Sequence, residues 1–310
     1  MTSTSNPRDL RAELETLTTE AFRPELAEID QLPTLDIARL MNGEDAAVPT
    51  AVARRLPEIA AAIDAVADRM ARGGRLLYAG AGTAGRLGVL DASECPPTFN
   101  TDPAQVVGLI AGGPEAMVTS VEGAEDSREL ARADLDALAV GAADTVVGIS
   151  ASGRTPYAIG AVEHARARGA LTIGLACNPD SALAAAADHG IEIVVGPELL
   201  TGSTRLKAGT AQKLVLNMLS TITMIRLGKT YGNLMVDVRA SNDKLRARSR
   251  RIVALATGAD DADIERALTE AGGEVKTAIL ILLADVDGPT ATRLLEESGG
   301  HLRAALASAT

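Results

Sequence analysis

The chain has few aromatic and cysteine residues, and these shortages exclude several classes of protein. Phe, Tyr and Trp make up 2% of its 310 residues, with no Trp at all, so it lacks the stacking surfaces of single-strand nucleic-acid binders. Its two cysteines, Cys95 and Cys177, are too few for a disulfide framework or a zinc site. We find no charged-then-apolar leader and no apolar run of about 20 residues. This pattern predicts a cytoplasmic protein that does not enter a membrane.

Positive charge is also in short supply. The 30 Lys and Arg residues are outnumbered by 41 Asp and Glu residues, which gives a formal net charge of -11. Because such a charge repels a polyanion, nucleic acid is not expected as a partner. A small anion must instead be held by local hydrogen bonds and by helix N-termini.

Short β-rich segments alternate with helical patterns along the middle of the chain, which is typical of βαβ units. Five of these segments are apolar almost throughout, as strands buried on both faces are. They are Arg75–Ala79, Gln105–Ile110, Thr145–Ser150, Leu171–Ala176 and Ile191–Val195. The pattern predicts an α/β fold with a five-stranded parallel sheet flanked by helices.

Further elements are expected on either side of the sheet. Helical spacing predicts helices over Thr50–Arg72, about Leu206–Leu227 and Ser241–Thr257, and Gly232–Val238 reads as extended. Beyond Gly258 we expect three short helices, at Asp263–Glu270, Val275–Leu283 and Ala291–Leu295. These patterns predict an N-terminal helical arm (1–49), a main α/β domain (50–257) and a C-terminal three-helix module (258–310). A module of about 50 residues is near the lower limit for independent folding, so it is expected to pack on the main domain or on a partner subunit.

A glycine-rich loop, Gly80–Gly85, follows the first predicted strand and precedes a helix, as in dinucleotide-binding proteins. Those proteins also carry an acidic residue at the end of the second strand, about 20 positions on. This chain has Pro96–Thr101 there, which disfavours a nicotinamide cofactor. The loop is then either a tight turn without a ligand or part of a binding site for a different anion.

A second polar loop, Ser150–Pro156, also lies between a strand and a helix. Thr155 suits the N-cap and Pro156 the first helical position, so hydroxyls and free amides point at one place, as a phosphate monoester requires. A capped helix after a Ser-rich turn explains the loop equally well. Two such loops at the carboxyl ends of parallel strands favour a sugar phosphate that bridges them.

Two carboxylates and one lysine are candidates for chemistry. Glu94 lies near the end of the first-loop helix, which Pro96–Pro97 is expected to stop. The negative helix end would raise the pKa of Glu94 and favour the protonated acid. Glu125 lies in an acidic run expected in a first helical turn, where acidic residues are common without a catalytic role. Lys207 is either a cation for the substrate or a solvated side chain.

Five motifs, in matching order and spacing over residues 15–300, resemble N-acetylmuramic acid 6-phosphate etherases. They are Gly80–Pro97 (GAGTAGRLGVLDASECPP), Val121–Glu129 (VEGAEDSRE), Ser150–Tyr157 (SASGRTPY), Leu206–Ser220 (LKAGTAQKLVLNMLS) and Gly232–Val238 (GNLMVDV). The resemblance implies a doubly wound sheet of the sugar isomerase (SIS) type, a ubiquitin-associated-like (UBA-like) C-terminal module and a homodimer. It also implies removal of D-lactate from N-acetylmuramic acid 6-phosphate during peptidoglycan recycling.

The resemblance further implies roles for single residues. Glu94 is the proton donor and Glu125 the second catalytic carboxylate. Substrate contacts fall on Gly82, Thr83, Ser150, Ser152, Gly153, Thr155 and Lys207. No metal or other cofactor is expected, because the C3 ether lies beta to the acidic C2–H of the open-chain aldehyde and can leave through an enolate. The chain departs from the family at Ala84, where Ser is usual, and at Leu206, where Met is usual.

Two other functions stay open. A non-catalytic regulator that senses sugar phosphates would share the fold, although retention of both carboxylates argues against it. An aldose-ketose isomerase shares the enolate chemistry but generally uses a histidine for ring opening. None of the three histidines, His164, His189 and His301, lies in the loops described above.

Overall fold

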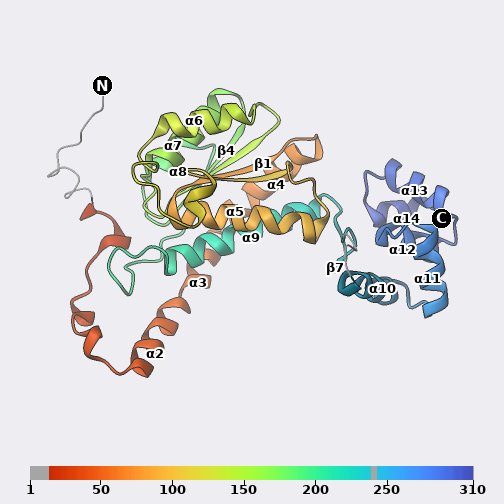
Figure 1. Ribbon diagram of the computed structural model, residues 1–310, viewed down its shortest axis with the longest axis horizontal. Coiled ribbons are helices and arrows are strands. Elements are labelled where there is room, and N and C mark those ends of the chain that lie inside the picture. Colours follow the sequence, from red (N-terminus) through yellow and green to blue (C-terminus); the bar gives the residue numbers. More distant parts are fainter. Residues whose placement is uncertain (1–13, 239–242, 310) are drawn as a thin grey trace. The chain divides into compact units, whose positions relative to one another are not determined.

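The computed structural model describes residues 14–238 and 243–309, and the chain forms two compact units (Figure 1). The first comprises Met1–Ala92 and Val106–Leu219, and the second comprises Ser93–Gln105 and Ser220–Thr310. Residues 1–13 of the predicted arm lie outside the described residues, as does Ser241, where the helix over Ser241–Thr257 was expected to begin.

The first unit is built on a five-stranded parallel sheet, which confirms the predicted fold class. Its strands are β1 (Leu76–Gly80), β2 (Val106–Ile110), β3 (Thr145–Ile149), β4 (Leu171–Ala176) and β5 (His189–Glu192), in the order β2-β1-β3-β4-β5. All residues of β1, β3 and β4 are buried, which is why their sequences are apolar without alternation. The strand order reverses between β1 and β3, and such a switch point is where open α/β sheets bind ligands.

Helices cover both faces of this sheet (Figure 1). The α-helices that begin in the first unit are α2 (Thr34–Asp45), α3 (Val48–Ala53), α4 (Leu56–Ala71), α5 (Gly82–Phe99), α6 (Arg128–Ala137), α7 (Pro156–Ala167), α8 (Ala182–Ala186) and α9 (Lys207–Arg226). Short 3-10 helices are η1 (Thr18–Glu20), η2 (Pro24–Leu26), η3 (Ile29–Gln31) and η4 (Pro114–Met117). Helices α6 and α7 share a core with Leu77, Ala79 and Val146.

Two helix predictions were wrong at prolines. The single helix expected over Thr50–Arg72 is divided into α3 and α4, because Pro57 begins a new helix within the first turn of α4. In contrast, Pro96–Pro97 does not stop α5, which continues to Phe99. The strand expected at Ile191–Val195 is shifted, because β5 pairs with β4 from His189 onward and ends at Glu192.

The second unit is mainly helical. It contains the antiparallel pair β6 (Thr230–Tyr231) and β7 (Leu234–Met235), followed by α10 (Asp243–Thr257), α11 (Asp261–Glu270), α12 (Val275–Ala284), α13 (Gly288–Glu297) and α14 (Leu302–Ala309). Beyond Gly258 there are thus four described helices, α11–α14, where the sequence predicted three. Val236, Ile252 and Val253 belong to the same buried core as these helices, so α10 and the strand pair pack with them.

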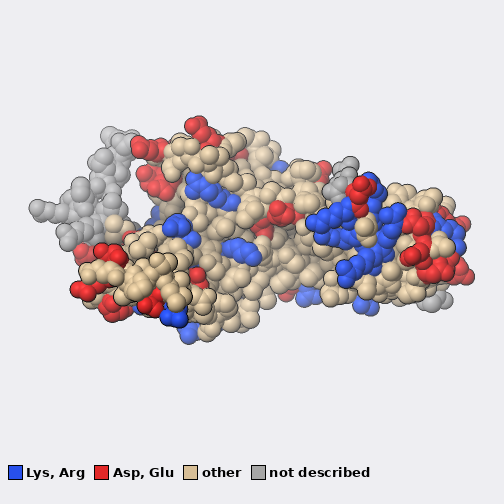
Figure 2. Space-filling model, turned by 60° about the horizontal axis from the view of Figure 1, so that its bottom comes forward, with Lys and Arg blue, Asp and Glu red and all other residues tan. Residues whose placement is uncertain are grey.

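The surface of the second unit carries a basic patch on α10. Lys and Arg side chains gather there (Figure 2), and the exposed ones on α10 are Lys244, Arg246, Arg248, Arg250 and Arg251. Within residues 14–238 and 243–309, no helix is both long enough and apolar enough to cross a membrane.

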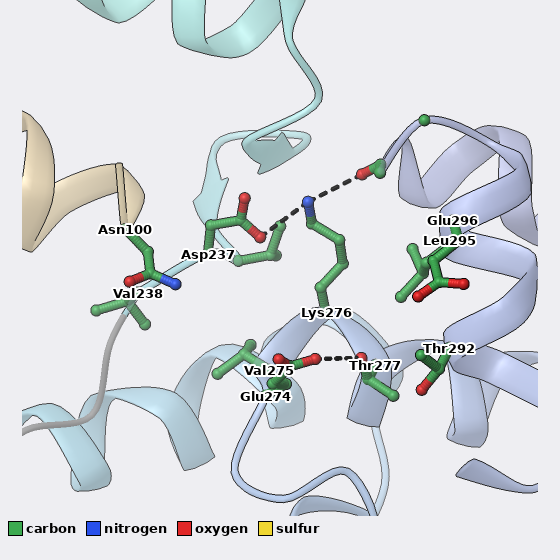
Figure 3. A pocket seen from close by; sticks show the side chains of 13 residues that line it. Asn100, Asp237, Val238, Glu274, Val275, Lys276, Thr277, Thr292, Leu295 and Glu296 are labelled. Carbon is green, nitrogen blue, oxygen red and sulfur yellow. Dashed lines mark hydrogen bonds and ion pairs between the residues drawn. The ribbon is translucent and has the colours of Figure 1, made fainter. Parts of the chain in front are cut away.

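A pocket of about 520 Å³ lies inside the second unit (Figure 3). Across it, the Lys276 ammonium donates to the Gly300 carbonyl at 2.9 Å and pairs with Asp237 at 2.8 Å. None of the residues that line this pocket was predicted to bind substrate or to catalyse.

Candidate active site

The predicted loops begin at one edge of the sheet. Gly80, the last residue of β1, pairs in register with Ile110 of β2 on one side and with Ile149 of β3 on the other. Three strands therefore end side by side, and the glycine-rich loop after β1 lies between the chain leaving β2 and the Ser-rich loop after β3. This is the switch point of the sheet.

The glycines of the first loop allow α5 to start immediately after β1. A Cβ on Gly85 would lie 2.6 Å from the Gly80 carbonyl oxygen, and one on Gly80 would lie 2.9 Å from the Gly85 nitrogen. Gly82 has φ +53, with no atom within 4 Å of the position of its missing Cβ, so its backbone is open to an approaching ligand. Ala84, which stands where the family usually has Ser, is buried.

The Ser-rich loop after β3 gathers three hydroxyls. The Ser150 Oγ lies 2.8 Å from the Thr155 Oγ1 and 3.2 Å from the Ser152 Oγ. It also accepts the Gly153 N–H at 3.0 Å, while the Ser152 Oγ accepts the Arg154 N–H at 3.1 Å. Thr155 is the N-cap of α7, as predicted, but its side chain makes no capping bond because it pairs with Ser150. The hydroxyls thus meet at the positive end of α7.

Gly153 is the residue that closes this loop against α8. It has φ +71, and a Cβ there would lie 2.3 Å from the Ser181 Cβ. Its carbonyl accepts the Leu183 N–H at 2.9 Å. Only glycine satisfies both the left-handed backbone and this close approach.

Glu125 lines a pocket of about 290 Å³ at the same sheet edge. Its lining consists of Ala81, Gly82, Arg86, Ala111, Ala116, Ser120, Val121, Glu122, Gly123 and Glu125. The pocket joins the glycine-rich loop to the segment that carries Glu125, which the sequence had linked only through the resemblance. Of the two predicted carboxylates, Glu125 is the one that this pocket includes.

The backbone of Glu125 is fixed to the Ser-rich loop. Its carbonyl accepts the Tyr157 N–H at 3.0 Å, and that N–H is one of those in the first turn of α7 that have no partner within the helix. The expected place of Glu125 in a first helical turn was wrong, because Ser127 caps α6 and the helix begins at Arg128. The Tyr157 hydroxyl donates to Asp134 at 2.6 Å, and burial together with this carboxylate raises the pKa of Tyr157.

Sequence reasoning missed two residues of α5 that tie it to neighbouring elements. Arg86 donates from Nε to the Met117 carbonyl at 3.0 Å and from Nη2 to the Ala116 carbonyl at 2.7 Å, which ties η4 to α5. Asp91 is buried and accepts from the Tyr78 hydroxyl at 2.8 Å and from Asn217 at 2.6 Å. Both lie in the motif used for recognition, but their partners are 13 to 126 residues away in the sequence.

Lys207 is the first residue of α9, and its side chain is buried rather than solvated. Its ammonium lies 2.5 Å from Glu44 Oε2, and Arg23 pairs with the other Glu44 oxygen at 2.7 Å. Burial alone would raise the pKa of Glu44, but the hydrogen bonds from Lys207 and Arg23 outweigh it and lower that pKa. The fully buried Glu198 accepts the backbone N–H of Lys207 at 3.0 Å. A substrate contact by the Lys207 ammonium would require the pair with Glu44 to open.

Glu94 lies on α5 and is exposed. Because α5 continues to Phe99, Glu94 is more than one 3.6-residue turn from the helix end. The effect of the helix dipole falls off within the last turn. The last turn of α5 therefore does not include Glu94. Glu94 falls in the segment assigned to the second unit, so its pairing with Glu125 stays a prediction.

Comparisons with known proteins agree with this fold. The model for the SIS domain matches residues 127–222, and the model for the glucokinase regulatory protein N-terminal SIS domain matches residues 58–166. An N-acetylmuramic acid 6-phosphate etherase from Streptomyces coelicolor is 87% identical over 309 residues, covering 100% of this chain and 99% of the relative. The chain belongs to the N-acetylmuramic acid 6-phosphate etherase family.

More distant members of this etherase family also match along most of their length. The one from Rubrobacter xylanophilus is 62% identical, over 94% of this chain and 96% of the relative. Among solved structures, a phosphoheptose isomerase from Francisella tularensis matches with a TM-score of 0.48 and 20% identity, over 63% of this chain and 100% of that one.

Proposed function

We propose that this enzyme is a lyase that cleaves the D-lactyl ether of N-acetylmuramic acid 6-phosphate, giving N-acetylglucosamine 6-phosphate and D-lactate in peptidoglycan recycling. The observation that carries the proposal is the 87% identity to a named etherase over the full chain. The site supports it, because hydroxyls at a helix N-terminus and a carboxylate in a pocket meet at one edge of the sheet.

The phosphate would bind the Ser-rich loop. Ser150, Ser152 and Thr155 offer hydroxyls at the positive end of α7. Gly82 and Thr83 would approach from the other side, since the loop after β1 is the neighbour of the loop after β3. A substrate anion held this way needs no favourable net charge on the protein.

The reaction needs two proton transfers. A base removes the C2 proton of the open-chain aldehyde, the electrons form a C2=C3 double bond, and the C3–O bond breaks. An acid protonates the departing lactate oxygen, because an alkoxide is a poor leaving group. Water then adds across the double bond, with its oxygen at C3 and a proton at C2. Glu94 is the proton donor in this proposal, and Glu125 is the second carboxylate and the candidate base.

Three properties of the whole protein are part of the proposal. The enzyme acts in the cytoplasm and forms a homodimer. Its chain is divided into an N-terminal arm (1–49), a main domain (50–257) and a UBA-like C-terminal module (258–310). Exposed apolar side chains on the N-terminal arm, Phe22 at 66% and Leu35 at 60%, support a second copy as partner. Sedimentation of the purified protein would test the dimer.

Release of D-lactate from N-acetylmuramic acid 6-phosphate is the decisive assay. The wild type should release lactate, and Glu125→Gln should lower kcat by about 100-fold or more, the effect of losing a general acid or base, while keeping its affinity for N-acetylglucosamine 6-phosphate. A protein that binds the sugar phosphate tightly but releases no lactate would be a sensor instead. Full activity in the Glu125→Gln variant would remove Glu125 from the mechanism.

A further inference from the structure

The pocket that contains Glu125 has one positively charged lining residue. Among its described lining residues, Arg86 carries the only cation, while Glu122 and Glu125 carry negative charge. A sugar phosphate that also bears a carboxylate would be repelled by two glutamates and by the net charge of -11. A cation in this pocket is therefore needed wherever such a carboxylate binds.

Arg86 is held in place and still has donors to spare. It is partly buried, and its Nε and Nη2 atoms bond the carbonyls of Met117 and Ala116. A guanidinium has five N–H donors, and no described residue accepts from Nη1. Both bonds go to neutral carbonyls, so the positive charge is not cancelled by a carboxylate. The arginine is preorganised to bind an anion with planar geometry.

We propose that Arg86 binds the carboxylate of the lactyl group. It thereby makes the site prefer N-acetylmuramic acid 6-phosphate, which carries the lactyl ether, over N-acetylglucosamine 6-phosphate, which does not. This inference rests on the proposed function. The lactyl group is attached at the C3 oxygen, which is the atom that leaves, so its carboxylate must lie close to the acid and base groups. The product sugar keeps its phosphate but lacks this carboxylate, and Arg86 thus separates substrate from product.

A second role for Arg86 follows from the same contacts and must be separated from the first. By tying η4 to α5, the arginine also shapes the segment that leads to Glu125. Loss of these two hydrogen bonds would weaken the binding of every ligand of the site. Loss of a carboxylate contact would affect only ligands that carry the lactyl group.

The test compares two ligands in Arg86→Met, Arg86→Lys and a control, Arg132→Met, which removes an exposed arginine of α6. Calorimetry measures N-acetylmuramic acid 6-phosphate binding in the Glu125→Gln background, where turnover is slow, and N-acetylglucosamine 6-phosphate binding in the same proteins. Arg86→Met should lower the affinity for N-acetylmuramic acid 6-phosphate about 10- to 100-fold, the range for a hydrogen bond to a charged group. It should change the affinity for N-acetylglucosamine 6-phosphate by less than about threefold. Arg86→Lys should lose less of the affinity for N-acetylmuramic acid 6-phosphate, and Arg132→Met should lose none.

Equal loss for both ligands would overturn the inference and leave Arg86 as a positioning residue of the loop. No loss for either ligand would overturn it as well. Failure of the proposed function has a different signature, because the wild type would then release no lactate at all. The two failures are thereby distinguished.

Discussion

Replacement of Gly153 by alanine should damage the Ser-rich loop in a way that the structure predicts quantitatively. The new methyl would lie 2.3 Å from the Ser181 Cβ and 3.0 Å from the Ala176 Cβ. Ser181 cannot move away easily, because its N–H donates to Glu192 at 2.7 Å and its hydroxyl caps α8. Either the loop or the start of α8 must shift.

The expected loss has two parts. A left-handed alanine costs roughly 1–2 kcal/mol, and forcing a methyl into a packed contact costs about 1–3 kcal/mol more. Gly196 supplies a matched control, since it has φ +72 against +71 for Gly153 but no atom within 4 Å of its Cβ position. Gly196→Ala should therefore show only the first part. Alanine stiffens the unfolded chain equally in both variants.

The assay is urea unfolding of both variants followed by circular dichroism. The difference of about 1–3 kcal/mol should place the Gly153→Ala midpoint roughly 0.5–1 M below that of Gly196→Ala. Calorimetry should also show weaker sugar phosphate binding in Gly153→Ala alone. Equal midpoints for the two variants would show that the close contact with Ser181 does not exist in solution, and the described loop geometry would be refuted.

Two ion pairs give further expectations. Glu44→Gln leaves the buried Lys207 ammonium without its charged partner and should destabilise the protein by about 3–5 kcal/mol. Lys207→Met should destabilise it less, because Arg23 still pairs with Glu44. A lower urea midpoint for Lys207→Met than for Glu44→Gln would contradict this. Burial would raise the pKa of Asp144, but hydrogen bonds led by that of Arg75 outweigh it and lower the pKa. The extra free energy of unfolding of the wild type over Asp144→Asn should be complete at pH 7 and should shrink as the pH falls below the unfolded-state pKa of about 3.9. Urea unfolding of both proteins at several pH values would measure this difference. A difference that stays constant down to pH 2 would refute the expectation.

Much of the fold follows from local sequence. The central strands were predicted within one residue because both of their faces are buried, so apolar residues are required throughout. The start of α7 was predicted because Pro156 fits the first turn whatever surrounds it. The break between α3 and α4 and the continuation of α5 past Pro96–Pro97 were missed, since a proline permits either outcome until neighbouring elements decide.

The sequence by itself determined the class of fold, the family and the positions of the two strand-end loops, because these depend on residue type and local spacing. Tertiary structure decided which side chains meet. Arg86 reaches η4, Lys207 is buried against Glu44, and the Glu125 carbonyl caps α7. Each of these contacts joins segments about 30 to 160 residues apart, and a hydrogen bond or ion pair over that separation leaves no periodic signal in the chain.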